Sequence, residues 1–217
     1  MKSTTVRYII FIIGLYFLSL GIVFIVRSTL GTTPISSLNY VLSLNTPITL
    51  GMATFLINML LILGQFWLIR GFGSMKDKAE ILLQIPFSFI FSAFIDFNMH
   101  LSTTMTPHNY LWSLVFLAIG CLCQSVGIVL ELKPNVAIMS AEGFVKYASR
   151  RYGREFGRLK VMFDVSLVSL AILTSLAFSG RIEGVREGSV IAALCTGYLV
   201  TGITAVLSRL RTLAAHR

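Results

Sequence analysis

The residues of this sequence best suited to chemistry are charged side chains placed inside or beside long apolar stretches. Asp164 lies in the apolar run Val161–Ser179, and Lys160 precedes it by four residues, so both would lie on one face of a helix. Ionisable groups inside a membrane are costly and usually face a bundle interior or an aqueous cavity. Asp164 is therefore a candidate proton or cation site with Lys160 as its coupling partner. A simple ion pair at the headgroup boundary is the alternative, and the sequence leaves both open.

Further polar side chains are candidates for binding a small substrate because they lie in or next to apolar segments. They are Arg27, Ser36, Asn39, Asn58, Gln84 and Glu142. Arg27 would attract an anionic group, whereas Glu142 would carry a coupling proton or, alternatively, would be a solvated residue at the interface. Arg186 and Glu187 lie between two glycines, which indicates close backbone packing, a gate or an exposed turn.

The common catalytic and metal-binding motifs do not occur in this sequence. It contains no His-Glu-x-x-His, nucleophile elbow or phosphate-binding loop. Cys121, Cys123 and Cys195 all lie in apolar stretches and are not spaced like zinc ligands. We therefore expect no enzymatic activity, no catalytic residue, no cofactor and no metal.

The composition is that of a membrane protein. Of 217 residues, 55% are hydrophobic and 12% are charged, and the mean hydropathy is +0.82. Soluble domains carry about 25% charged residues, so this chain has too few to cover a surface in water. The net charge of +9 is concentrated between apolar runs, which indicates contact with anionic lipid headgroups rather than with nucleic acid. The lipid bilayer is thus the expected partner.

Six segments are predicted to cross the bilayer, which takes about 20 apolar residues. They are Tyr8–Val26, Leu50–Ile69, Ile81–Ile95, Tyr110–Leu130, Val161–Ser179 and Ser189–Leu207. The third is short and contains Gln84 and Pro86, so we expect it to be tilted, kinked or extended at its ends.

The basic residues predict the orientation of these segments. With the N-terminus in the cytoplasm, all but three of the 18 Lys and Arg residues fall on the cytoplasmic side. The exceptions are Arg27, Arg181 and Arg186. This bias predicts six spans with both termini in the cytoplasm.

The two halves of the sequence align without a gap when one is shifted by 106 residues. Gly14 then meets Gly120, Ser19 to Val23 meet Ser125 to Val129, and Asn58 meets Asp164. Because each half holds three spans, the two copies must enter the membrane in opposite directions. We expect a single membrane domain over residues 1–217 with repeats at about 8–97 and 110–207. The predicted fold is an all-α membrane protein whose six transmembrane helices form two inverted three-helix repeats.

A short segment follows the first span of each repeat. Residues 27–43 and 133–149 both run from an irregular piece with Pro or Gly into a short helical pattern. Thr33 and Ser140 are predicted helix N-caps, and Pro34 suits a first helical turn. These crossover segments are either re-entrant half-helices or amphipathic helices in the interface, and the sequence does not decide between them.

Several short pieces resemble a known bacterial family. They are Gly31 to Pro34, Met139 to Gly143, Phe156-Gly157, Lys160 with Asp164, and Gly184 to Gly188. In these the chain is similar to the YczE-like integral membrane proteins, which are related to the YitT group. The resemblance implies a multi-pass protein of the bacterial inner membrane and carries over no biochemical activity.

Inverted repeats predict a small secondary transporter or facilitator of a small polar solute or ion. Arg27 favours an anionic solute. The site is expected between the two repeats, built from both crossover segments and the second and fifth spans. The alternative is a non-transporting accessory protein that holds an export or biosynthetic complex together. A homodimer is compatible with so small a bundle, and nothing in the sequence fixes it.

Overall fold

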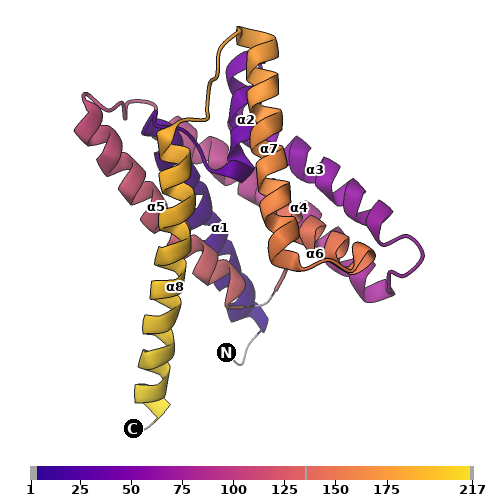
Figure 1. Cartoon of the computed structure of the whole chain (residues 1–217). Coiled ribbons are helices and arrows are strands. Elements are labelled where there is room, and N and C mark those ends of the chain that lie inside the picture. The colour runs from indigo at the N-terminus through magenta and orange to yellow at the C-terminus, as the bar shows by residue number, and fades with distance from the viewer. Residues whose placement is uncertain (1–3, 135, 216–217) are drawn as a thin grey trace. The chain divides into compact units, whose positions relative to one another are not determined.

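The computed structural model describes residues 4–134 and 136–215, with side chains up to residue 206, and shows eight helices and no strand in these residues (Figure 1). The helices are α1 (Thr4–Arg27), α2 (Pro34–Asn45), α3 (Leu50–Leu68), α4 (Met75–Leu101), α5 (Tyr110–Leu132), α6 (Ser140–Tyr152), α7 (Phe156–Ser179) and α8 (Glu187–Ala215). The predicted all-helical fold is confirmed. Lys2 and Arg217, which contribute to the predicted charge bias, lie outside the described residues.

Six helices within the described residues are long and apolar enough to cross a membrane: α1, α3, α4, α5, α7 and α8. The protein is therefore a multi-pass membrane protein, as its sequence predicts. The third span is longer than the predicted run Ile81–Ile95, because α4 extends for 27 residues and includes Pro86. Its first turn carries Asp77, whose carboxylate accepts hydrogen bonds from the Ser74 backbone and hydroxyl at 2.9 and 2.8 Å. The charged residues at this end lower the local hydropathy, so the sequence did not predict the start of the helix.

The helix starts repeat with the offset seen in the sequence. Residues 4, 34 and 50 begin α1, α2 and α3, and residues 110, 140 and 156 begin α5, α6 and α7. Each pair differs by 106. The fourth pair departs from this rule, since α4 begins at residue 75 and α8 at residue 187. The repeat boundaries inferred from the sequence stay predictions, but three of four helix pairs follow the offset.

One of the predicted helix caps is wrong. Met139 occupies the N-cap position of α6 and forms no side-chain cap, and Ser140 is the first helical residue. The Ser140 hydroxyl instead lies 3.2 Å from the Ser88 hydroxyl of α4. Pro34 is the first residue of α2, where its fixed φ and missing N–H suit a helix start.

The chain divides into two compact units, and both combine parts of the first and second halves. Unit 1 comprises Met1–Thr33, Leu101–Val136 and Arg186–Arg217, and thus α1, α5 and α8. Unit 2 comprises Pro34–His100 and Ala137–Val185, and thus α2, α3, α4, α6 and α7.

In unit 1, α1 and α5 cross in antiparallel fashion at glycines. A Cβ atom on Gly21 would lie 2.6 Å from the Gln124 backbone nitrogen, and one on Gly127 would lie 2.5 Å from that of Leu18. The offset of 106 converts the first contact into the second, since it carries Gly21 to Gly127 and Leu18 to Gln124. This exchange is the local signature of a two-fold axis between inverted helices. Glycine is required here because the two backbones approach too closely for any side chain.

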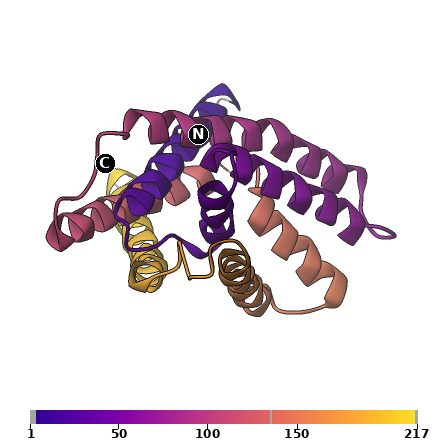
Figure 2. The same cartoon turned by 90° about the horizontal axis from the view of Figure 1, so that it is seen from above.

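Unit 2 pairs each crossover helix with a span from the other half. Helix α2 packs on α7 through Leu38, Val41 and Leu167, and the two helices lie side by side in both views (Figure 1, Figure 2). Helix α6 packs on α3 through Tyr147 and Ile62. Val41 and Tyr147 are equivalent under the offset, so both crossover helices use the same position for burial.

The glycine crossing leads to a direct stability prediction. Gly21→Ala places a methyl group against the Gln124 backbone and should lower the free energy of unfolding by about 1–3 kcal/mol, the usual cost of overpacking. Gly202→Ala on α8 is the control, because a Cβ there meets nothing within 4 Å. Thermal unfolding in detergent, followed by circular dichroism, measures both. Equal melting temperatures for the two variants would contradict the packing described.

Candidate functional site

Unit 2 contains the four elements from which the sequence predicts a site, namely both crossover helices and the second and fifth spans. Most candidate residues are in this unit: Ser36, Asn39, Asn58, Gln84, Glu142, Lys160 and Asp164. Arg27, Arg186 and Glu187 belong to unit 1 instead.

The second half of the chain contributes an ion pair on α7. Lys160 Nζ lies 2.6 Å from Asp164 Oδ1, and the two side chains are only 23% and 28% exposed. The ion pair that their spacing allows is present, and a coupling role for it stays a prediction. Both residues lie on the same face of α7 as Leu167 and Ala171, which are buried against the rest of unit 2. The pair therefore faces the protein side of the helix.

Glu142 is a third charge at the same place. It is the third residue of α6, and its carboxyl group interacts electrostatically with Lys160 and with Asp164. Desolvation by the surrounding protein raises the pKa of Glu142, and the negative charge of Asp164 acts in the same direction, whereas Lys160 opposes it. Glu142 is thus within electrostatic range of the Lys160–Asp164 ion pair. Its carboxyl group takes up a proton more readily than an isolated glutamate does.

The first half of the chain contributes an uncharged polar cluster. Asn39 Nδ2 of α2 donates to Thr54 Oγ1 of α3 at 3.2 Å. Asn58 follows Thr54 by one helical turn on the same face of α3. Ser36, Asn39, Thr54 and Asn58 are all buried. The offset carries Ser36 to Glu142, Thr54 to Lys160 and Asn58 to Asp164, so equivalent positions are neutral in one copy and charged in the other.

Gln84 forms a reciprocal amide pair with Gln65. Gln65 Nε2 donates to Gln84 Oε1 at 2.8 Å, and Gln84 Nε2 donates to Gln65 Oε1 at 2.9 Å. Gln65 also donates to the Ser140 carbonyl oxygen at 3.1 Å. Gly143 lies against this pair, since a Cβ there would come within 2.7 Å of Gln65 Oε1. The pair therefore positions the first turn of α6, and a role for Gln84 in substrate binding stays a prediction.

Basic residues secure the other end of α6. Arg150 Nη1 lies 2.7 Å from Asp77 Oδ1, and Lys146 Nζ lies 2.5 Å from Glu80 Oε1. Arg151 Nη1 donates to the carbonyl oxygen of Leu68 at the end of α3, at 2.9 Å. Helix α6 is thus held at both ends by α3 and α4.

The candidates in unit 1 take part in backbone packing at the start of α8. Gly188 N donates to Leu30 O at 2.8 Å, and a Cβ on Gly188 would lie 2.6 Å from that same oxygen. Arg186 pairs with Glu187 at 3.6 Å and donates to Thr29 O at 3.3 Å. The backbone packs closely at Gly188, whereas the Arg186 and Glu187 side chains are 56% and 47% exposed, and a role as a gate stays a prediction. Arg27 Nε donates to Ser102 Oγ at 3.1 Å.

Several contributing residues were not among the candidates from sequence, above all Gln65, Thr54 and Ser92. Thr54 and Gln65 share one helical face with Asn58, because they lie four residues before it and seven residues after it. A test of helical periodicity for polar residues within the second span would have found both. Ser92, whose buried hydroxyl has no partner among the described residues, follows Gln84 and Ser88 at a spacing of four residues, so the same test on the third span would have found it.

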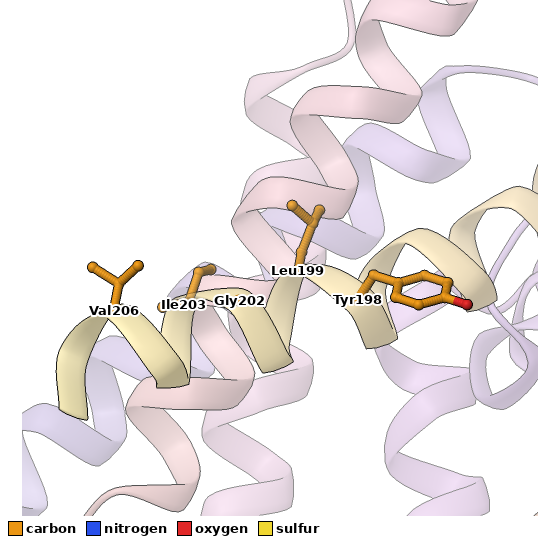
Figure 3. A pocket seen from close by; sticks show the side chains of 5 residues that line it. All are labelled: Tyr198, Leu199, Gly202, Ile203 and Val206. Atoms are coloured by element: carbon orange, nitrogen blue, oxygen red, sulfur yellow. The ribbon is translucent and has the colours of Figure 1, made fainter. Parts of the chain in front are cut away.

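A hollow along α8 in unit 1 is of a different kind. Its lining residues are Tyr198, Leu199, Gly202, Ile203 and Val206, all from this one helix (Figure 3). None of these five is charged, and none is a site candidate. Among the described residues, no group of three or more His, Cys, Asp or Glu could hold a metal ion.

A family model matches residues 5–205, which include all of the candidate residues. The chain belongs to the DUF6198 family. This family is described as one of unknown function. No curated protein and no solved structure matches the chain. Its resemblance to the YczE-like and YitT groups stays a prediction.

The glutamine pair yields a prediction about coupling. Gln65→Leu and Gln84→Leu should each cost about 1–3 kcal/mol, because each leaves a buried amide without its partner. The double variant should cost less than the sum of the two, since no orphaned amide remains. Thermal unfolding of the four proteins gives the interaction energy. Additive costs would show that the amides do not act as a pair.

Proposed function

We propose that this protein is a small secondary transporter or facilitator of a small polar solute, with its binding site in unit 2. The observation that supports this proposal is the polar interior shared by α2, α3, α6 and α7. Asn39 and Asn58 are buried, and Glu142 and Asp164 are half-buried, on helices that the inverted repeat makes equivalent. Polar and ionisable groups inside membrane segments are expensive, and they usually mark a substrate or proton pathway.

The proposed location is the bacterial inner membrane, with the N- and C-termini in the cytoplasm. The six candidate spans support this topology because an even number returns the chain to its starting side. The sequence places most Lys and Arg residues on that side. Helices α2 and α6, at 12 and 13 residues, are too short to add a crossing.

The charged cluster supplies a mechanism for coupling solute movement to protons. Lys160 pairs with Asp164, and desolvation raises the pKa of the neighbouring Glu142, so Glu142 is the group that would bind the coupling proton. A proton taken up on one side of the membrane and released on the other would leave the carboxylate unchanged after each cycle. The solute would move together with the proton if the solute site is occupied while the carboxyl group is protonated.

This proposal predicts that ligands stabilise the purified protein in a way that depends on the charged cluster. In a thermal-unfolding screen against small ions, polyols, amides and organic acids, a ligand at a hundredfold above its Kd should add about 2.7 kcal/mol. In the wild type the shift should depend on pH above the ordinary pKa of a glutamate, because the pKa of Glu142 is raised. It should lose that pH dependence in Glu142→Gln and weaken in Asp164→Asn.

Glu155→Gln is the matched control, because Glu155 is an exposed acidic residue beside Arg158 at the start of α7. Its stabilisation by ligand should equal that of the wild type. A screen without hits, together with normal cellular function of Asp164→Asn, would refute transport. That result would favour the accessory role, in which the internal polar residues are dispensable.

A further inference from the structure

We propose that Asn39, Asn58 and Ser92 form the part of the site that holds the solute, and that they select a neutral hydrogen-bonding group such as a hydroxyl or an amide. This inference rests on the proposed transport function and specifies its substrate class. It departs from the lean toward an anion that the sequence alone suggests.

The first observation is a set of buried atoms without partners in unit 2. Asn39 Oδ1, Asn58 Nδ2 and Ser92 Oγ each lack a hydrogen bond within the described protein. Their side chains belong to residues that are 3%, 8% and 5% exposed. A buried polar atom left unpaired costs about 1–3 kcal/mol, so three such atoms on neighbouring helices require an explanation.

The orientation of the Asn39 amide follows from its neighbours. The single proton of the Thr54 hydroxyl goes to the Leu50 carbonyl oxygen at 2.8 Å. Thr54 Oγ1 must therefore accept its second hydrogen bond, and Asn39 Nδ2 provides it at 3.2 Å. Asn39 Oδ1 is then fixed as a free acceptor.

The three unpaired atoms come from three neighbouring helices. Asn58 lies one turn beyond Thr54 on α3, and Gly51 lies nearly one turn before it. Helix α4 reaches the same face of α3, because the Ser92 carbonyl oxygen occupies the space where a side chain on Gly51 would begin. Helices α2 and α4, which carry Asn39 and Ser92, thus both contact the first half of α3, which carries Asn58.

The chemistry of these atoms favours a neutral ligand. Asn39 Oδ1 requires a donor, Asn58 Nδ2 requires an acceptor, and the Ser92 hydroxyl can serve as either. The Asp96 carboxylate, one turn from Ser92, is already occupied by Thr49 Oγ1 at 2.7 Å and by Gly51 N at 2.8 Å. An anion brought into this cluster would lose its hydration, would gain no positive charge from these three groups and would be repelled by the Asp96 carboxylate.

Solute recognition and proton transfer would then belong to different copies of the repeat in unit 2. Asn58 in the neutral copy corresponds to Asp164 in the charged copy, and Thr54 corresponds to Lys160. The neutral copy would recognise the solute, and the charged copy would carry the proton.

Osmotic swelling of proteoliposomes tests this inference with the full chain. Vesicles that contain the protein face gradients of erythritol, lactamide or glucose as neutral probes, and of acetate, phosphate or choline as charged probes. We expect at least one neutral probe to enter faster than into protein-free vesicles. Asn39→Leu and Asn58→Leu, which keep the approximate side-chain size, should lower that rate at least tenfold.

Asn45→Leu is the matched control, because the Asn45 side chain already donates to Val41 O at 2.9 Å. Ser92→Ala and Ser43→Ala form a milder second pair, since Ser43 Oγ donates to Tyr40 O at 2.8 Å. We expect Ser92→Ala to slow the neutral probe several-fold and Ser43→Ala to leave it unchanged. Circular dichroism of each variant verifies that the helices are intact.

The outcomes separate this inference from the transport proposal. If only charged probes enter, or if folded Asn39→Leu and Ser92→Ala transport neutral probes at the wild-type rate, the neutral site is refuted and transport stands. If no probe enters wild-type vesicles and none raises its melting temperature, transport itself fails, and the inference fails with it.

Discussion

A polar group in the hydrocarbon region of a bilayer cannot hydrogen-bond to lipid, so its partners must come from the protein, from a ligand or from water that enters a cavity. Most of the structure follows from how this demand is met in each unit. In unit 2, Gln65 and Gln84 satisfy each other and hold the start of α6. The Asp96 carboxylate takes the free N–H of Gly51 at the start of α3. These completed hydrogen bonds hold the helices in position. Asn39 Oδ1 and Asn58 Nδ2 have no such partner, and a ligand can supply one.

The inverted repeat gives two similar arrangements of helices, but the two copies carry different polar residues at equivalent positions. In the first copy, Asp96 accepts a hydrogen bond from Gly51 N at the start of α3, whereas α7 in the second copy begins without a side-chain cap. The neutral pair Thr54 and Asn58 becomes Lys160 and Asp164. A symmetric fold with asymmetric chemistry suits a carrier, because recognition and coupling can then be altered separately.

Much of the fold could be predicted from the sequence, because long apolar runs have one solution in a membrane. The offset of 106 residues predicted the equivalence of helices that the structure places at residues 4 and 110, 34 and 140, and 50 and 156. The start of α4 escaped because its first turns are charged. The Ser140 cap was wrong because a tertiary partner, Ser88, competes for the hydroxyl group. The site was predictable only in part: the spacing of Lys160 and Asp164 predicted their contact, but the pairing of Gln84 with Gln65 depends on how α3 and α4 pack, which composition does not encode.

If unit 2 binds a solute from water, its polar side chains must be accessible from water while the apolar faces of the same helices meet lipid. Cysteine accessibility tests it most directly, in a chain whose native residues Cys121, Cys123 and Cys195 are replaced by alanine. Asn58→Cys and Asp164→Cys should react with a small, charged, membrane-impermeant thiol reagent. Leu60→Cys and Leu173→Cys, whose native side chains are 62% and 63% exposed on the surface of α3 and α7, should not react, because lipid covers them. Reaction at the two leucine positions, with none at positions 58 and 164, would contradict a water-filled site in unit 2.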